Sequence, residues 1–254
     1  MKRGYTSRAP LQRLIMNSSL YHLVAWGFQN LIWDGQLIDA HNLPASGPAI
    51  LVANHLRALG PVAVGGSVPL QMYSWVHADM LDPRLAADYL RRDFIEPQLH
   101  LPRPFSLWLS KLIAWIHVPL LQAIGGIPVY HNADGLGRTY RRTVDLLEQG
   151  ECILIFPEDP DLPMDARYEM TPFKKGFTRL GELFYERTRR ALAFYPLAVH
   201  AESRTVRAGL PVRYQPLNPP LEERRRLKSM LEESIHAMLL GASTEHYLGQ
   251  PLPN

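Results

Sequence analysis

Four short apolar runs, each bounded by turn residues and separated by longer helical patterns, constrain the fold of this chain most strongly. They are residues 49–53 (AILVA), 126–130 (GIPVY), 152–156 (CILIF) and 193–199 (AFYPLAV). A strand reads as a continuous apolar run when helices cover both faces of its sheet, which is typical of parallel sheets. The alternation therefore predicts an α/β fold with a largely parallel central sheet flanked by helices.

The segments between and after these runs have helical periodicity. We expect helices over 138–148, 174–190 and 221–240, the first and last of which stop just before a glycine. The chain shows no internal repeat and no proline-rich linker. We therefore expect two parts, a helical N-terminal lead-in over 1–45 that is a candidate for membrane contact, and one α/β domain over 46–254.

Two longer apolar segments raise the question of a membrane. Polar residues interrupt residues 11–33, which disfavours a cleaved signal or a spanning helix there and favours an amphipathic or buried one. Residues 105–124 contain Lys111 and Pro119 within an otherwise apolar stretch. Two interpretations of that stretch stay open, namely a core helix and a helix that lies shallowly in the membrane interface.

Composition excludes several classes of function. The formal net charge is only +3, and the arginine clusters are scattered without interleaved aromatic residues, so we expect no nucleic-acid partner. The single cysteine, Cys152, permits neither an intramolecular disulfide nor a cysteine-rich zinc site. A Gly-x-Ser-x-Gly nucleophile elbow is absent from the sequence, which disfavours a hydrolase of that type.

Polar residues follow the apolar runs at the positions where ligands of α/β sheets usually bind. His55 follows the first run and is either a general base or a structural histidine. Glu158 and Asp159 follow the third run, where carboxylates bind a cation, bind hydroxyl groups or cap turns. Lys174 and Lys175 lie at the start of an expected helix and suit an anion, but such lysines are also common on any surface.

Taken in order, these strand ends resemble the motifs of the lysophospholipid acyltransferase superfamily, which includes the 1-acylglycerol-3-phosphate acyltransferases. The first block, Asn-His-x-x-x-x-Asp-Pro, is similar to residues 54–61, and the second, Gly-x-Ile-x-Val-x-Arg, is similar to residues 125–131. The third, Phe-Pro-Glu-Gly-x-Arg followed by Phe-Lys-x-Gly, is similar to residues 156–161 and 173–176. The fourth, a Val-x-Pro-Val strand, is similar to residues 194–199.

The resemblance implies an activity. In that family the motif histidine removes a proton from an acceptor hydroxyl, which attacks the thioester of acyl-CoA or acyl carrier protein, while the motif aspartate orients the imidazole. It implies no metal and no cofactor beyond that acyl donor, and a cytoplasmic protein bound peripherally to membrane lipids. The candidate catalytic residues are His55 and Asp159, and the candidate substrate-binding residues are Asn54, Arg57, Gly126, His131, Phe156, Pro157, Glu158, Lys174 and Lys175.

The sequence also departs from the motifs. Gly60 stands at the aspartate position, His131 and Asp161 at the two arginine positions, and Asp159 at a glycine position. The loss of both basic residues makes a phosphorylated acceptor unfavourable. Two hypotheses follow. One is an acyltransferase that acts on a sugar, a polyol or an amino-acid-derived lipid; the other is a non-catalytic protein that binds lipid or acyl carrier protein.

Two geometric predictions separate these hypotheses. We expect His55, Glu158 and Lys175 to converge on one face of the sheet, because all three follow or lie near the ends of neighbouring strands. An active enzyme needs an acceptor group that holds the second nitrogen of the His55 ring. We expect the carboxylate of Asp159, or failing that of Asp79, to supply it, and a backbone carbonyl is a weaker substitute. A non-catalytic protein needs no such partner.

Overall fold

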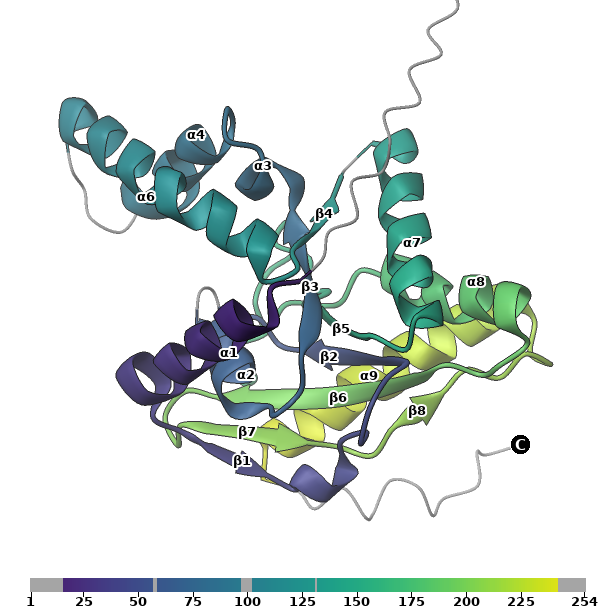
Figure 1. Ribbon diagram of the computed structural model, residues 1–254. Helices are drawn as coiled ribbons and strands as arrows, with labels where there is room; N and C mark the ends of the chain where they lie inside the picture. The colour runs from purple at the N-terminus through teal and green to yellow at the C-terminus, as the bar shows by residue number, and fades with distance from the viewer. Residues whose placement is uncertain (1–15, 57–58, 97–101, 131, 242–254) are drawn as a thin grey trace, which may run out of the picture.

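The computed structural model describes residues 16–56, 59–96, 102–130 and 132–241, and it confirms an α/β fold built on one eight-stranded sheet (Figure 1). The order across the sheet is β1-β7-β6-β2-β5-β3-β4, and β8 also pairs with β6. The strands are β1 (Gln36–Ile38), β2 (Ala49–Ala53), β3 (Met72–His77), β4 (Ile127–Val129), β5 (Cys152–Ile155), β6 (Ala193–His200), β7 (Thr205–Ala208) and β8 (Val212–Arg213).

The centre of the sheet is parallel, and its antiparallel strands lie beyond β6. β6, β2, β5, β3 and β4 run in one direction, whereas β7 and β8 are antiparallel to β6. Val52 lies opposite Ile155 of β5 and opposite Pro196 of β6. The carboxyl ends of these three strands therefore meet at one edge, which is where the candidate site residues follow.

Helices cover both faces of the sheet. α1 (Ser18–Gly27), the π-helix η1 (Phe28–Trp33) and α2 (Leu59–Ser67) contact one another on one side, and α7 (Ala133–Glu148), η4 (Gly176–Thr178), α8 (Arg179–Thr188) and α9 (Pro220–Leu239) lie on the other (Figure 1). A short 3-10 helix, η2 (Ala40–Asn42), follows β1. Between β3 and β4 come α3 (Ala78–Leu81), α4 (Ala86–Leu90), the π-helix η3 (Arg91–Ile95) and the long α6 (Arg103–Ala123).

The two cores explain why the central strands read as continuous apolar runs. Along β2, Ile50 and Val52 face the core under α7 to α9, while Leu51 and Ala53 face the core that contains Trp33 of η1. All five side chains of β2 are buried. A strand that is buried on both faces does not alternate apolar and polar residues. Its apolar composition, and not a period of two, therefore identified β2 in the sequence.

The sequence predicted four of the eight strands, and it placed the three later helices with shifted boundaries. α7 begins five residues before position 138, because Asn132 caps it by accepting the Gly135 N–H at 2.7 Å. The stretch 174–190 is a 3-10 turn followed by α8. The segment assigned to a helical lead-in contains α1 and η1, but it also contributes β1, which pairs with β7 and belongs to the sheet.

α6 packs through only one of its faces. A stripe of small residues at every fourth position, Ser106, Ser110, Ala114 and Val118, is buried, and its last two members pack into a cluster with Ala86 and Leu90 of α4. The opposite face is apolar and exposed, with Trp115 at 77% and Trp108 at 66% relative exposure. By length and composition, α6 is long and apolar enough to cross a membrane, and 22% of its most apolar window is buried.

Candidate active site

The site begins where Asn54 ties the end of β2 to β6. This side chain is completely buried, and its Oδ1 accepts the Val199 backbone N–H at 2.7 Å. Its Nδ2 donates to the Val199 carbonyl oxygen at 3.0 Å. Both ends of the amide are therefore used within the protein, which gives Asn54 a structural role in this geometry rather than the predicted contact with substrate. The consequence is a fixed position for the next residue, His55.

His55 leaves the sheet beside Phe156, which follows β5. The imidazole ring meets the Phe156 ring edge-on, with centroids 5.1 Å apart and planes at 82°. Directly after it, Leu56 has a φ of 41°, a left-handed conformation that is unfavourable for a residue other than glycine. The chain therefore turns sharply at the end of β2, so that the histidine stays at the carboxyl edge of the sheet.

Glu158 holds the backbone of His55 from the neighbouring strand. One carboxylate oxygen accepts the His55 backbone N–H. The other accepts the Thr171 backbone N–H at 2.8 Å and the Thr171 hydroxyl at 3.1 Å. Glu158 thus joins the turn after β2 to the segment that carries the lysines, so two of the three residues expected to converge, His55 and Glu158, lie together at this edge.

Asp159 and the lysines form a second layer beside this clamp. The Lys174 backbone N–H donates to the Pro157 carbonyl at 2.8 Å, and the Lys174 ammonium pairs with Asp159 at 3.2 Å. Lys175 is exposed one residue further on. The basic segment is therefore attached to the end of β5, and Asp159 neutralises the charge of Lys174, one of its two lysines.

Within the described residues, no carboxylate hydrogen-bonds the His55 ring. The Asp159 carboxylate pairs with Lys174 and accepts the Asp161 backbone N–H. Asp79 lies beside a different histidine, with Oδ2 3.9 Å from His77 Nδ1. The predicted orienting contact from Asp159 or Asp79 is thus absent from this geometry, because both carboxylates are directed to other partners.

Burial sets the protonation state of His55. Desolvation of the partly buried imidazole lowers the pKa of His55 below the ordinary histidine value. Since no carboxylate opposes this shift in the described structure, the ring is neutral at neutral pH. A neutral imidazole can accept a proton. Without a neighbouring carboxylate, however, the imidazolium ion that forms is less stabilised.

The backbone explains why residue 60 is glycine. Gly60 lies in the first turn of α2 and donates its N–H to the His55 carbonyl at 2.9 Å. A Cβ atom at this position would lie 2.1 Å from the same oxygen, well inside van der Waals contact. The turn between β2 and α2 is therefore closed more tightly than any residue with a side chain permits, which the motif comparison alone did not reveal.

The other predicted site residues separate into two groups. Gly126 is buried before β4, where its N–H donates to the Leu121 carbonyl at 2.8 Å, which is a structural role. Arg57 and His131 lie outside the described residues. No group of three or more metal-ligating side chains occurs in the part of the chain that the structure describes.

Sequence reasoning missed a polar cavity lined by Leu56, the residue after His55. About 200 Å³ in volume, it lies between the ends of β2 and β6 and the loop before the lysines. Its lining includes Leu56, Arg167, Glu169, His200 and Glu202. His200 follows the fourth apolar run as His55 follows the first, so the same rule that selected His55 would have pointed to this cavity.

Comparison with known proteins adds one finding about the fold. No protein-family model and no curated protein sequence matches the chain. Among solved structures, the fold is similar to that of PlsC, the 1-acyl-sn-glycerophosphate (LPA) acyltransferase from Thermotoga maritima, with a TM-score of 0.50. The two chains are 13% identical, and the alignment covers 87% of this chain and 78% of that one. The likeness extends over most of both chains and concerns their architecture.

Proposed function

We propose that the protein transfers a fatty acyl group from acyl-CoA or acyl carrier protein to an acceptor hydroxyl, with His55 as general base. The observation that carries this proposal is the clamp of Glu158 on the His55 backbone, which sets a neutral imidazole at the carboxyl edge of a parallel sheet. The architecture shared with the acyltransferase PlsC supports it.

The chemistry uses few groups. The neutral His55 ring takes the proton of the acceptor hydroxyl while the hydroxyl oxygen attacks the thioester carbonyl carbon. The carbon–sulfur bond then breaks, and the departing thiolate recovers the proton from the imidazolium. Because no described carboxylate stabilises that imidazolium, turnover is expected to be slow relative to an enzyme with a complete histidine–carboxylate pair.

The surroundings of His55 favour an acceptor without a phosphate. Lys174 is paired with Asp159, and the cavity beside Leu56 carries the carboxylates of Glu169 and Glu202 with a single arginine, Arg167. Carboxylates accept hydrogen bonds from hydroxyl or amino groups and repel a phosphate. A sugar, a polyol or an amino-acid-derived lipid suits this cavity.

The direct test is an assay of the purified protein with acyl-CoA and acyl carrier protein donors against acceptors with and without a phosphate. We expect ester formation to be faster with an unphosphorylated acceptor. Faster turnover of lysophosphatidate than of any unphosphorylated acceptor would contradict the assignment of acceptor class, and no ester with any acceptor would contradict acyl transfer itself.

The pH dependence of the reaction follows from the burial of His55. Its lowered pKa means that the folded protein keeps the imidazole neutral to a lower pH than a free histidine does. We therefore expect the acidic limb of kcat/KM to lie below pH 6.5, the approximate value for unperturbed histidine. A pH profile at constant ionic strength measures this. An acidic limb above pH 6.5 would require a carboxylate beside the ring.

Substitution of Gly60 is expected to damage the fold instead of restoring the motif. Gly60→Ala places a Cβ against the His55 carbonyl and should lower the free energy of unfolding by about 1–3 kcal/mol. Gly60→Asp adds a charge to the same clash and should give no gain in turnover. Chemical denaturation of both variants measures the effect.

Gly137→Ala is the matched control for Gly60. Gly137 lies within α7, and an added Cβ there would have no neighbour within 4 Å. Alanine should leave the free energy of unfolding unchanged or raise it by up to about 1 kcal/mol. Equal stability of the Gly60 and Gly137 variants, or a large gain in turnover for Gly60→Asp, would show that the turn after β2 opens to accept a side chain.

A second function is favoured by the lack, among the described residues, of a carboxylate hydrogen-bonded to the His55 ring. A protein that keeps the fold but binds lipid or acyl carrier protein without turnover needs no carboxylate near the imidazole, as found among the described residues. Equilibrium binding of acyl carrier protein or of a fatty acid, measured beside the turnover assay, discriminates the two. Tight binding with no ester formed would select the non-catalytic function.

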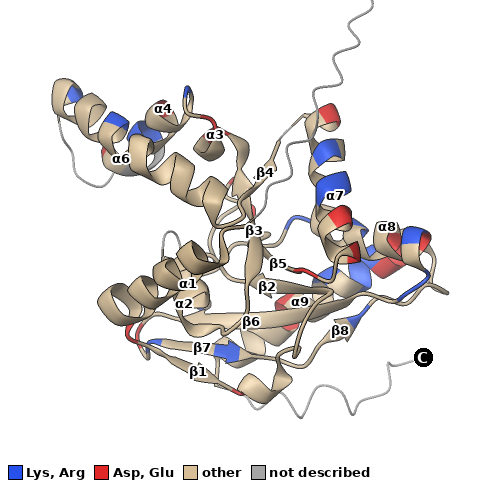
Figure 2. Ribbon diagram, in the orientation of Figure 1, with Lys and Arg blue, Asp and Glu red and all other residues tan. Residues whose placement is uncertain are grey.

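We also propose that the protein binds peripherally to a membrane from the cytoplasm through α1 and α6. The Tyr21 hydroxyl of α1 donates to the Leu70 carbonyl at 2.9 Å, which fixes that helix to the protein body. The other face of α1 exposes Leu23 and Trp26. Neither α1 nor α2 carries a Lys, Arg, Asp or Glu residue (Figure 2). Together with the outer face of α6, these side chains offer an apolar surface for the lipid interface.

A further inference from the structure

A second cavity lies away from His55, between η3 and the start of α6. It has a volume of about 490 Å³ and is lined by Asp88, Arg91, Arg92, Arg103, Pro104 and Leu107. The lining therefore contains three arginines and only one acidic residue, Asp88. Nothing in the proposed acyl transfer uses this cavity, which we call the arginine pocket.

The floor of the arginine pocket is rigid. The buried Arg91 guanidinium is bound by Glu96 at 2.8 Å and by Asp88 at 3.3 Å. The Ser106 hydroxyl of α6 donates to the same Glu96 carboxylate at 3.0 Å. This network ties η3 to α6, so the walls of the pocket are held at a fixed separation without a ligand.

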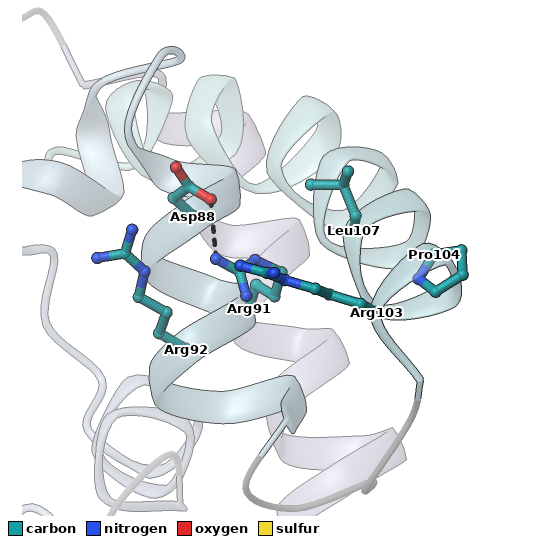
Figure 3. A pocket seen from close by; sticks show the side chains of 6 residues that line it. All are labelled: Asp88, Arg91, Arg92, Arg103, Pro104 and Leu107. Atoms are coloured by element: carbon teal, nitrogen blue, oxygen red, sulfur yellow. Dashed lines mark hydrogen bonds and ion pairs between the residues drawn. The ribbon is translucent and has the colours of Figure 1, made fainter.

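The other two arginines have a different environment. Arg92 and Arg103 are exposed and come from opposite walls, and Figure 3 shows Arg103 extending from α6 toward Arg91 with Arg92 across the pocket. Directing like charges into one space is unfavourable unless an anion enters it. Guanidinium groups bind phosphate oxygens through two parallel hydrogen bonds, which makes a phosphate the ligand that this set suits best.

The position of the arginine pocket identifies the source of that phosphate. Leu107 and Pro104 form its apolar rim, and the neighbouring Phe105 and Trp108 begin the exposed outer face of α6. A basic site continuous with an apolar, tryptophan-bearing helix face is complementary to a phospholipid, whose phosphate and acyl chains are adjacent. A soluble anion would gain nothing from that apolar face.

We propose that the arginine pocket binds the phosphate headgroup of an anionic phospholipid while the outer face of α6 enters the lipid interface. The inference rests on the proposed peripheral membrane binding, to which it adds a lipid preference. It assigns Arg92 and Arg103 to a membrane contact distinct from the acyl-transfer site.

The test is flotation with vesicles of phosphatidylcholine alone and with added phosphatidylglycerol. Arg92→Gln with Arg103→Gln should lower the partition coefficient on phosphatidylglycerol vesicles by about 30-fold, at about fivefold per basic residue, and change it little on phosphatidylcholine. Arg92→Lys with Arg103→Lys keeps the charge but loses the forked hydrogen bonds, so it should also bind phosphatidylglycerol vesicles more weakly than the wild type.

The matched control removes two charges elsewhere. Arg190→Gln with Arg225→Gln, after α8 and on α9, should change the partition by less than about threefold, because these exposed arginines are remote from α6. An equal loss for both pairs, or no loss for the lysine pair, would show diffuse charge attraction and overturn the pocket.

The remaining outcomes separate this inference from the proposal on which it rests. Equal flotation of wild type on both vesicles, unchanged by the glutamine pair, would overturn the pocket and leave membrane binding intact. No flotation on either vesicle would overturn both. Titration with inorganic phosphate is the last arm. Binding that the glutamine pair abolishes, with vesicle partition unaffected, would identify a soluble anion and overturn the lipid assignment.

Discussion

Replacing His55 by alanine is expected to lower kcat/KM for acyl transfer by about 100- to 10,000-fold, the usual contribution of a general base. The imidazole is the titratable group that the Glu158 clamp holds at the carboxyl edge of the sheet. Alanine keeps the backbone N–H that Glu158 binds, so the clamp should survive and the loss should be chemical. Steady-state kinetics with the best acceptor from the panel measures it.

His41→Ala is the control for this substitution, because His41 is an exposed histidine in η2. It should leave kcat/KM unchanged. The free energy of unfolding should change by no more than about 1 kcal/mol for either variant, since His55 is only partly buried beside Phe156. If His55→Ala retains full turnover, the proton is removed by another group, and the site proposed around His55 is wrong.

The central strands were predictable because a strand that is buried on both faces consists almost entirely of apolar residues. β2 and β5 are buried on both faces and therefore appear as unbroken apolar runs. β1 and β8 have three and two residues, too few for any pattern to register. β7, with the sequence TVRA, alternates partly buried and buried side chains and lies outside the parallel centre, so it carries no apolar run.

The sequence predicted where in the fold the candidate site lies, but not which side chains pair with one another there. The rule that ligands bind beyond the carboxyl ends of parallel strands brought His55 and Glu158 together correctly. The partner of each side chain was not predictable, because partners depend on backbone separations that a sequence does not state. Asp159 pairs with Lys174, fifteen residues further along the chain, since the two segments run side by side after β5.

The closed turn at Gly60 explains why the motif aspartate is missing. Where the α2 backbone lies against the His55 carbonyl, a carboxylate at residue 60 has no room. The histidine must then act alone or not act, and the neutral ring that burial favours is the form that can still accept a proton. The path of the backbone around Gly60 therefore excludes an aspartate at this position, and we expect that the single substitution Gly60→Asp does not restore the motif.

The second large effect is expected at Asn54. Asn54→Ala removes both partners of Val199 at a completely buried position, leaving a backbone N–H and a carbonyl oxygen without hydrogen bonds. Each unsatisfied buried group costs about 1–3 kcal/mol, so the free energy of unfolding should fall by about 2–6 kcal/mol. Urea denaturation measures the fall. Turnover should fall as well, because the end of β2 that positions His55 loses its tie to β6.

Asn42→Ala provides the comparison at a residue of the same type. Asn42 is only partly buried, and its Nδ2 makes one hydrogen bond to the Ala208 carbonyl at 2.9 Å, which water can replace. The expected loss is about 1 kcal/mol or less, without an effect on turnover. Equal losses for the two variants would mean that water reaches Val199 when Asn54 is removed. In that case the end of β2 would be held by Glu158 alone, and Glu158→Gln should then have the larger effect on both stability and turnover.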